Sequence, residues 1–172
     1  MKFFLLLFSL AAIFCANASP LTDEVDKLIL RSIPLIGTED LASEIKADRK
    51  PVLLDTRQPE EYQVSHLPGA YWVGFKNFEA QNLPKIEKDS SIIVYCSVGY
   101  RSEKIGEKLK AAGYTHVRNL YGGIFAWANE GLALEDREGK TTKTVHGYDR
   151  KWAKLLAPEV PKVINHEREP RP

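Results

Sequence analysis

The chain has 172 residues, 44% of them hydrophobic, so it can bury one proper core but has little room for two domains. Its 24 basic and 23 acidic residues give a formal net charge of +1, which excludes the strongly basic class typical of proteins that bind nucleic acid or anionic membranes. Two cysteines and four scattered histidines show no metal-ligand spacing, so no metal site is predicted.

Residues 1–18 have the pattern of a secretory signal peptide. Lys2 precedes a short apolar run, and Ala16-Asn17-Ala18 is a small-x-small cleavage site. The run falls short of the ~20 residues that span a bilayer, so no transmembrane segment is predicted in the mature chain. We expect cleavage near Ala18 and export to the periplasm or out of the cell. An uncleaved anchor and a lipoprotein linked through Cys15 are the alternatives.

Removal of that segment would leave 23 basic and 23 acidic residues, with Cys96 as the only cysteine. Cys96 could then form no intramolecular disulfide, although the compartment is one in which disulfides normally form. A lone thiol in an exported protein is either buried and inert or available to react. The sequence around Cys96 therefore has to distinguish these two cases.

Helical and strand patterns alternate along the middle of the chain. Residues 19–37 are a lead-in with a helical apolar face, and residues 38–48 are predicted to form a helix that Thr38 caps. Short connections between alternating elements predict an α/β fold with a mostly parallel sheet. The elements that follow are strands at 51–54, 70–73, 92–95 and 116–120, and helices from 59, at 75–81, at 102–112 and at 124–129.

The alternation ends near residue 135, and residues 136–172 form a charged, proline-rich C-terminal extension. Its one apolar island is Trp152, Leu155 and Leu156. We expect this island to anchor the extension on the domain surface, and the alternative is a partner-binding segment. The predicted organisation is a signal peptide at 1–18, a lead-in at 19–37, a domain at 38–135 and the extension at 136–172.

The residues that carry chemistry lie between the strand at 92–95 and the helix at 102–112. Cys96 follows a buried strand and precedes a helix, so the helix dipole and the N–H groups of the loop favour its thiolate form. Gly99 allows the loop to bend round the sulfur. Arg101 offers a planar array of donors that can bind an oxyanion or hold the loop through a carboxylate. This pattern predicts a nucleophile inside an anion-binding loop.

The motif Cys96-x-x-Gly99-x-Arg101-Ser102 resembles the active-site loop of the rhodanese (thiosulfate sulfurtransferase) domain family. Residues 54–70 are similar to the upstream signature of that family, and residues 119–123 with Trp127 are similar to its downstream signature. The three stretches occur in the expected order within residues 38–134. The resemblance implies a rhodanese-like α/β fold, with a mostly parallel central sheet of about five strands flanked by helices.

The resemblance also implies a sulfurtransferase. The Cys96 thiolate would take a sulfane sulfur from a donor such as thiosulfate or a persulfide, hold it as a cysteine persulfide, and pass it to a thiophilic acceptor. That acceptor would be cyanide, a small thiol or the thiol of a partner protein. Neither a metal nor an organic cofactor is implied, and no nucleic-acid partner is expected.

Roles for individual residues follow from the same resemblance. Arg101 would either contact the substrate anion or brace the loop, and Asp55 and Arg57 would form a supporting ion pair beside it. His66 would be a structural hydrogen-bonding residue, and Tyr71 and Trp127 would be core or pocket-wall aromatics. The substrate cradle would be formed by the backbone amides of Ser97, Val98, Gly99, Tyr100, Arg101 and Ser102.

Loop length separates the expected activity from related ones. Phosphatases of dual specificity and arsenate reductases that share the fold carry a loop one residue longer, whereas residues 96–101 here number six, the sulfur-transfer length. Val98 and Tyr100 predict a loop rim with little positive charge, which disfavours dianionic thiosulfate. Two alternatives are a non-catalytic rhodanese-type module that binds a partner or carries sulfur, and an exported redox-sensing thiol.

Overall fold

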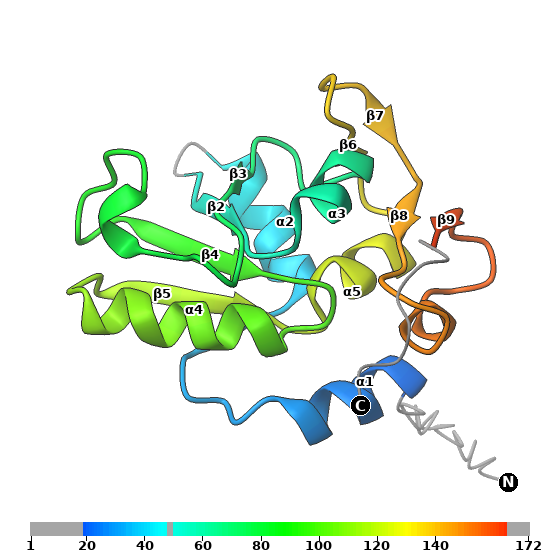
Figure 1. Cartoon of the computed structure of the whole chain (residues 1–172), viewed down its shortest axis with the longest axis horizontal. Coiled ribbons are helices and arrows are strands. Elements are labelled where there is room, and N and C mark those ends of the chain that lie inside the picture. The colour runs from blue at the N-terminus through cyan, green and yellow to red at the C-terminus, as the bar shows by residue number, and fades with distance from the viewer. Residues whose placement is uncertain (1–18, 48–49, 165–172) are drawn as a thin grey trace, which may run out of the picture.

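The computed structural model describes residues 19–47 and 50–164 (Figure 1). The predicted signal segment, with Cys15, lies outside these residues. A five-stranded parallel sheet in the order β1-β5-β4-β2-β3 forms the centre. Its strands are β1 (Leu35–Ile36), β2 (Val52–Asp55), β3 (Tyr71–Trp72), β4 (Ser91–Tyr95) and β5 (His116–Leu120).

Helices flank this sheet, and short elements follow it (Figure 1). Within the described part of the chain, no helix is long and apolar enough to cross a membrane. The α-helices are α1 (Pro20–Leu28), α2 (Thr38–Lys46), α3 (Pro59–Val64), α4 (Tyr100–Ala111) and α5 (Gly123–Asn129). The short elements are the 3-10 helices η1 (Ala80–Asn82) and η2 (Trp152–Leu155), and the strands β6 (Leu134–Glu135), β7 (Thr141–Thr142), β8 (Val145–His146) and β9 (Lys162–Val163).

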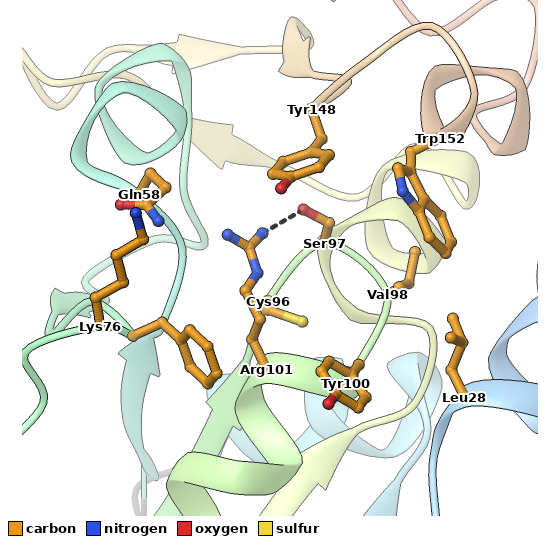
Figure 2. Close-up of a pocket in the computed structure, with 11 residues that line it drawn as sticks. Leu28, Gln58, Lys76, Cys96, Ser97, Val98, Tyr100, Arg101, Tyr148 and Trp152 are labelled. Carbon is orange, nitrogen blue, oxygen red and sulfur yellow. Dashed lines mark hydrogen bonds between the residues drawn. The ribbon is translucent and has the colours of Figure 1, made fainter. Parts of the chain in front are cut away.

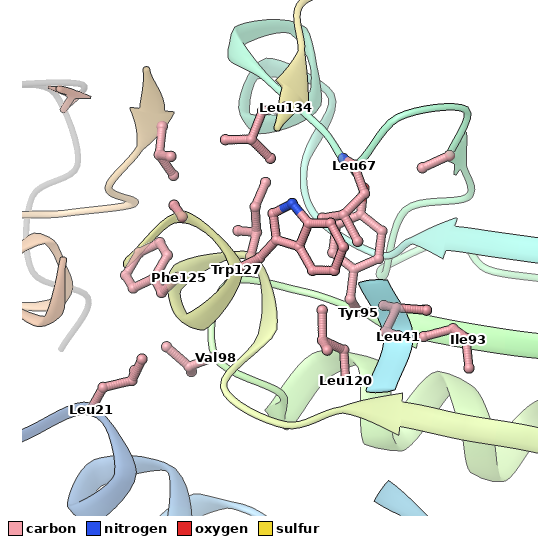
Figure 3. Close-up of a cluster of buried hydrophobic side chains, with 14 of the residues drawn as sticks. Leu21, Leu41, Leu67, Ile93, Tyr95, Val98, Leu120, Phe125, Trp127 and Leu134 are labelled. Carbon is pink, nitrogen blue, oxygen red and sulfur yellow. Dashed lines mark hydrogen bonds between the residues drawn. The ribbon is translucent and has the colours of Figure 1, made fainter. Parts of the chain in front are cut away.

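The central strand β4 is apolar because both faces of the sheet are covered. Successive side chains of a strand point to opposite faces. Ile92 and Val94 accordingly pack in one apolar cluster with side chains of α4, while Ile93 and Tyr95 pack in a second with Leu41 of α2 and with α5 (Figure 3). The predicted α/β class with a five-stranded parallel sheet is therefore confirmed, and the parallel order brings the ends of β2 and β4 to the same edge.

Three local predictions were wrong. Thr38 does not cap α2, because Gly37 holds that position and the Thr38 hydroxyl donates to the Glu130 carboxylate instead. Residues 75–81 do not form a helix, since their apolar side chains Phe75 and Phe78 pack on the α4-side cluster and only η1 is helical nearby. Tyr71 is 52% exposed and is no core or pocket-wall residue, because β3 is a two-residue edge strand that pairs only with β2.

Residues 136–164 of the C-terminal extension are more ordered than their composition predicts. β8 and β9 pair in parallel, and β8 contacts α3. Leu156 is buried, and Trp152 and Leu155 pack against the cluster on the α5 side of the sheet. The apolar island thus lies on the domain, in the arrangement expected of an anchor.

Candidate active site

Cys96 directly follows β4 and lies four residues before Tyr100, the first residue of α4. Figure 2 shows it in the segment that we call the Cys96 loop (residues 96–102). Gly99 adopts a φ of 115°, a conformation that suits glycine, and its N–H donates to the Cys96 sulfur at 3.1 Å. The thiol is only 1% exposed, yet it lines a cavity of about 300 Å³. The cavity is lined by Leu28, Gln58, Phe75, Lys76, Cys96, Ser97, Val98, Tyr100, Arg101, Tyr148 and Trp152.

The surroundings of Cys96 favour its thiolate. Burial by itself raises the pKa of a thiol, because a charge is less stable away from water. The positive charge of Arg101, hydrogen bonding by the N–H and hydroxyl of Ser102, and the Gly99 N–H act in the opposite direction, and the pKa of Cys96 is lowered overall. The loop can therefore present a sulfur nucleophile at a lower pH than a free thiol could.

Arg101 is held by a carboxylate beneath the loop. Its Nη1 and Nη2 donate to the two oxygens of Glu61, each at 2.8 Å, and Nη2 also donates to Ser97 Oγ at 2.9 Å. The Ser97 hydroxyl donates to Glu61 Oε1 at 3.0 Å, which closes the triangle. The Arg101 side chain nevertheless keeps 15% of its surface exposed and lines the cavity. It therefore braces the loop and remains within reach of a bound anion.

Glu61 is ionised although it is fully buried. Burial raises the pKa of a carboxyl group, but here hydrogen bonds and charge from Arg101, together with the charge of Arg57, lower the pKa of Glu61 to about 2. A fixed negative charge under the loop balances the charge of Arg101.

The back of the Cys96 loop is held by the segment after β5. The N–H groups of Ile124 and Phe125, at the start of α5, donate to the carbonyls of Cys96 and Ser97 at 2.9 and 3.1 Å. Gly123 makes this approach possible, because a Cβ atom there would lie 2.3 Å from the Cys96 carbonyl oxygen.

Asn119, the next-to-last residue of β5, holds the far end of the same loop. Its Nδ2 donates to the Gly99 carbonyl at 2.9 Å, and its Oδ1 accepts from the Ser102 hydroxyl at 2.7 Å. Both side-chain atoms of one buried amide are thereby satisfied within the loop. The stretch at 119–123 thus contacts the Cys96 loop with its backbone and with this side chain.

Asp55 and Arg57 lie beside the loop but do not line the cavity. They form a buried ion pair in which Arg57 Nη2 lies 2.6 Å from Asp55 Oδ2. Burial lowers the pKa of a guanidinium, yet the charge and hydrogen bonds of Asp55 leave the pKa of Arg57 raised overall. Thr56, between them, donates its N–H to the Tyr95 carbonyl at 2.9 Å. The pair fixes the end of β2 next to the strand that carries Cys96.

Two further residues named from the sequence support the fold near this edge. His66 stacks on Tyr62, with 3.9 Å between ring centroids, and its Nδ1 lies 3.1 Å from the Tyr62 carbonyl oxygen. Trp127 is buried in the core, and its Nε1 donates to the Ala133 carbonyl at 2.9 Å. Neither residue lines the cavity.

The structure divides the predicted cradle. Four of its six residues, Ser97, Val98, Tyr100 and Arg101, line the cavity, whereas Gly99 and Ser102 act behind it through hydrogen bonds. Tyr100 is 45% exposed at the rim. Val98 was expected at the rim as well, but it is buried, because it packs in the apolar cluster that also contains Leu21 and Val25 of α1.

Several residues of the site were not identified from the sequence. Glu61 carries one local signal, since it is the acid of a capping box with Gln58 at the start of α3. That signal predicts a contact within α3 and not the pair with Arg101. For the other cavity residues, no sequence signal indicates that they lie near Cys96. These residues are Leu28, Phe75, Lys76, Tyr148 and Trp152. Within residues 19–47 and 50–164, no group of three or more His, Cys, Asp or Glu side chains is placed to hold a metal ion.

Comparison with known proteins agrees with this architecture. A protein named sulfurtransferase from Allochromatium vinosum is 33% identical over 104 residues, which are 60% of this chain and 96% of that protein. A probable adenylyltransferase/sulfurtransferase from Mycobacterium tuberculosis is 31% identical over 96 residues, 55% of this chain. The chain spans about a quarter of the length of that relative, namely 24%.

Solved structures give the same result. The rhodanese-like domain of an Anabaena protein is 26% identical with a TM-score of 0.56, and the match covers 60% of this chain and 80% of that one. A rhodanese-like domain protein from Staphylococcus aureus is 28% identical with a TM-score of 0.54, and the match covers 61% and 99%. The family model described as the rhodanese-like domain matches residues 38–130. The chain therefore belongs to the rhodanese-like domain family.

Proposed function

We propose that this protein is a sulfurtransferase in which Cys96 carries the transferred sulfur as a persulfide. Family membership and relatives named sulfurtransferases support sulfur transfer in general. The observation that carries the proposal is the Cys96 sulfur itself, which lines a cavity, accepts the Gly99 N–H and has a lowered pKa. A nucleophile activated inside a preorganised loop is what covalent transfer requires.

The proposed reaction has two displacements. In the first, the Cys96 thiolate attacks the outer sulfur of a donor such as thiosulfate. A new S–S bond forms to Cys96, the S–S bond of the donor breaks, and sulfite leaves with the electron pair. In the second, a nucleophile such as cyanide or a thiolate attacks the outer sulfur of the persulfide, and Cys96 leaves as a thiolate. No net oxidant or reductant is consumed.

Each part of the loop has a role in these steps. The N–H groups and hydroxyl that stabilise the thiolate can stabilise a persulfide anion at the same position. Arg101 contributes positive charge there, and Glu61 holds it in place. The loop carbonyls, which would repel an anion, are occupied by the N-terminal N–H groups of α5. The loop thus presents donors to the sulfur and turns its acceptors away.

The experiment is single-turnover loading followed by mass spectrometry. The protein, reduced and then incubated with thiosulfate or with an organic sulfane donor, should gain one sulfur atom on the peptide that contains Cys96. Addition of cyanide should remove that sulfur and release thiocyanate. Cys96→Ser, which keeps the size of the side chain, should gain none. Absence of loading with every donor would contradict the proposal and favour a non-catalytic binding module.

We also propose that the protein is exported, with cleavage after Ala18. The support is the pattern of Lys2, the apolar run and Ala16-Asn17-Ala18. The test is the N-terminal residue of the mature protein, purified from a bacterial host fractionated into cytoplasm, periplasm and medium. Cleavage predicts Ser19 in the periplasm or medium, whereas a lipid on Cys15 would replace this proposal with membrane anchoring.

A further inference from the structure

We infer that the C-terminal extension completes the substrate pocket, and that Tyr148 and Trp152 select organic sulfur compounds with an apolar body and a single negative charge over inorganic thiosulfate. The inference rests on the proposed sulfur transfer at Cys96. It concerns residues outside the stretch at 38–130 that matches the family, so the family match does not account for it.

The two aromatic rings form one wall of the cavity. Figure 2 shows Tyr148 beyond the end of the Arg101 side chain, and Trp152 next to Val98. The Arg101 guanidinium carbon lies 5.2 Å from the centroid of the Tyr148 ring. Trp152 is partly buried and packs against the apolar cluster on the α5 side of the sheet. A substrate that reaches the Cys96 sulfur therefore has an aromatic surface beside it.

Backbone contacts hold this wall in position. Tyr148 has a φ of 65°, rare for a residue with a side chain, and its N–H donates to His146 Nδ1 at 3.0 Å. Asp149 Oδ1 accepts the N–H of Lys151 at 2.8 Å and that of Trp152 at 2.9 Å. A residue kept in an unfavourable conformation is fixed by its surroundings and is often part of a site. The wall is preorganised, which lowers the entropy lost when a ligand binds.

The turn before Tyr148 packs closely on η2. A Cβ atom at Gly147 would lie 2.7 Å from that of Ala153, which is itself buried. The strand β8, just before this turn, contacts α3, the helix that carries Glu61. The aromatic wall therefore follows a strand that lies against the helix carrying Glu61.

The charge of the pocket fits a monoanion with an apolar body. Arg101 is balanced by Glu61, so Lys76 is the one remaining cation among the described residues that line the cavity, and none of those residues is acidic. Once Cys96 is ionised, its charge offsets that of Lys76. A dianion such as thiosulfate is then less well compensated than a monoanion, whereas an apolar group gains binding energy from Phe75 and the aromatic wall.

The cavity volume agrees with such a ligand. At about 300 Å³ it lies at the lower end of the range for small organic ligands, and six of its eleven lining residues are apolar or aromatic. The expected class of donor or acceptor is thus a small organic persulfide, thiosulfonate or thiol.

Three sulfane donors allow the effect of an apolar group on the transfer rate to be separated from the effect of the charge. Benzenethiosulfonate and methanethiosulfonate are both monoanions and differ only in the phenyl or methyl group, while thiosulfate is a dianion. After attack by Cys96 they release benzenesulfinate, methanesulfinate and sulfite. We expect kcat/KM for the phenyl donor to exceed that for the methyl donor by at least about tenfold, because the phenyl group buries apolar surface. Intrinsic reactivity is corrected by the rates with a free thiol.

Variants then test the aromatic wall. Tyr148→Ala with Trp152→Ala should lower the phenyl-to-methyl ratio by at least about fivefold. Tyr148→Phe and Trp152→Phe should retain most of it, and Tyr71→Ala, which removes an exposed aromatic outside the cavity, should keep the wild-type ratio. Thermal unfolding verifies that each variant is folded. An unchanged ratio in the folded double-alanine variant would overturn the inference.

A binding measurement distinguishes failure of this inference from failure of the proposed function. Cys96→Ser cannot transfer sulfur, and titration calorimetry with benzenesulfinate and methanesulfinate reports the pocket alone. We expect tighter binding of benzenesulfinate, with the preference lost when both aromatics are replaced. Loading of Cys96 without this preference would leave the sulfur transfer intact and overturn the aromatic selection. Preference without any loading would retain the pocket and contradict the sulfur transfer.

Discussion

The two sides of the pocket are held by different kinds of interaction. The Cys96 loop is held by directional hydrogen bonds between buried polar groups, from Glu61, from Asn119 and from the N-terminus of α5. The C-terminal extension combines apolar packing, with Leu156 buried and Trp152 against the core, with hydrogen bonds of its own backbone to Asn129 and Asp149. Chemistry at a sulfur atom requires donors placed to a fraction of an ångström, whereas a wall for an apolar group requires only shape.

The two kinds of support also fail differently. Loss of one partner in a buried polar network leaves a charge or donor without compensation, and the cost is large. Loss of packing atoms leaves a cavity whose cost depends on how far the neighbours relax. The substitutions below therefore separate the loop from the wall.

The largest effect is expected for Arg101→Ala. It leaves the buried Glu61 carboxylate without its bidentate partner, which should lower the free energy of unfolding by about 3–5 kcal/mol. It also removes the charge that lowers the pKa of Cys96, so that pKa should rise. Urea denaturation measures the first effect, and the pH dependence of iodoacetamide alkylation measures the second.

Arg118→Ala is the matched control. Arg118 also forms a two-bond pair with a glutamate, Glu44, at 2.7 Å for both bonds, but the two side chains are 28% and 37% exposed. Solvent screening should limit its loss of stability to less than about 1 kcal/mol. Equal losses for the two arginine variants would contradict the role of the Glu61–Arg101 pair as a buried brace.

The next largest effect is expected from acid, which should lower the free energy of unfolding by protonating Glu61 beneath the Cys96 loop. The pKa of Glu61 is about 2 in the folded protein, below its ordinary 4.5. A depressed carboxyl pKa contributes stability that is complete above about pH 5 and is lost as the pH falls through 4.5 towards 2. The loss should be on the order of 3 kcal/mol, measured by denaturation across this range. Glu61→Gln should lack that part of the acid dependence and start from a lower stability, and an unchanged profile would contradict the assignment.

Leu156→Ala addresses the wall. It removes a buried side chain of the extension and should cost about 2 kcal/mol or more, as truncation of a buried leucine does. The rate of Cys96 alkylation should change little, since the loop has its own supports. Leu30→Ala, at a side chain that is 75% exposed, is the control and should cost less than about 0.5 kcal/mol. A large change in the alkylation rate of Cys96 in this variant would contradict the independence of the loop and the wall.

Lys76→Ala should have the smallest effect. Lys76 is exposed, so the stability should change by less than about 0.5 kcal/mol. Its charge faces the cavity, and its loss should raise KM for anionic donors about threefold to fivefold at low salt. Steady-state kinetics at two salt concentrations measure this, with Lys85→Ala as a charge control outside the cavity. A change in kcat without a change in KM would speak against a binding role.

Much of the loop was predictable from the sequence because its signals are local. The apolar run of β4, the helix pattern of α4 and the spacing of Cys96, Gly99 and Arg101 all act over a few residues. The pattern failed where neighbours in space decided the outcome. The conformation of residues 75–81 is set by the packing of Phe75 and Phe78, and the helical pattern of the sequence is not realised there. The Thr38 hydroxyl donates a hydrogen bond to Glu130 instead of capping α2.

The sequence by itself determined the parallel α/β class and the place of Cys96 between a strand and a helix, since periodicity and turn residues encode backbone conformation directly. It also predicted Cys96 as the nucleophile. Only the tertiary structure decided that Arg101 is braced by Glu61 and that Tyr148 and Trp152 line the cavity. The partners in these contacts are separated by about forty to fifty residues. Their meeting depends on how the whole sheet and its flanking segments pack, and no local preference of the chain specifies that distance.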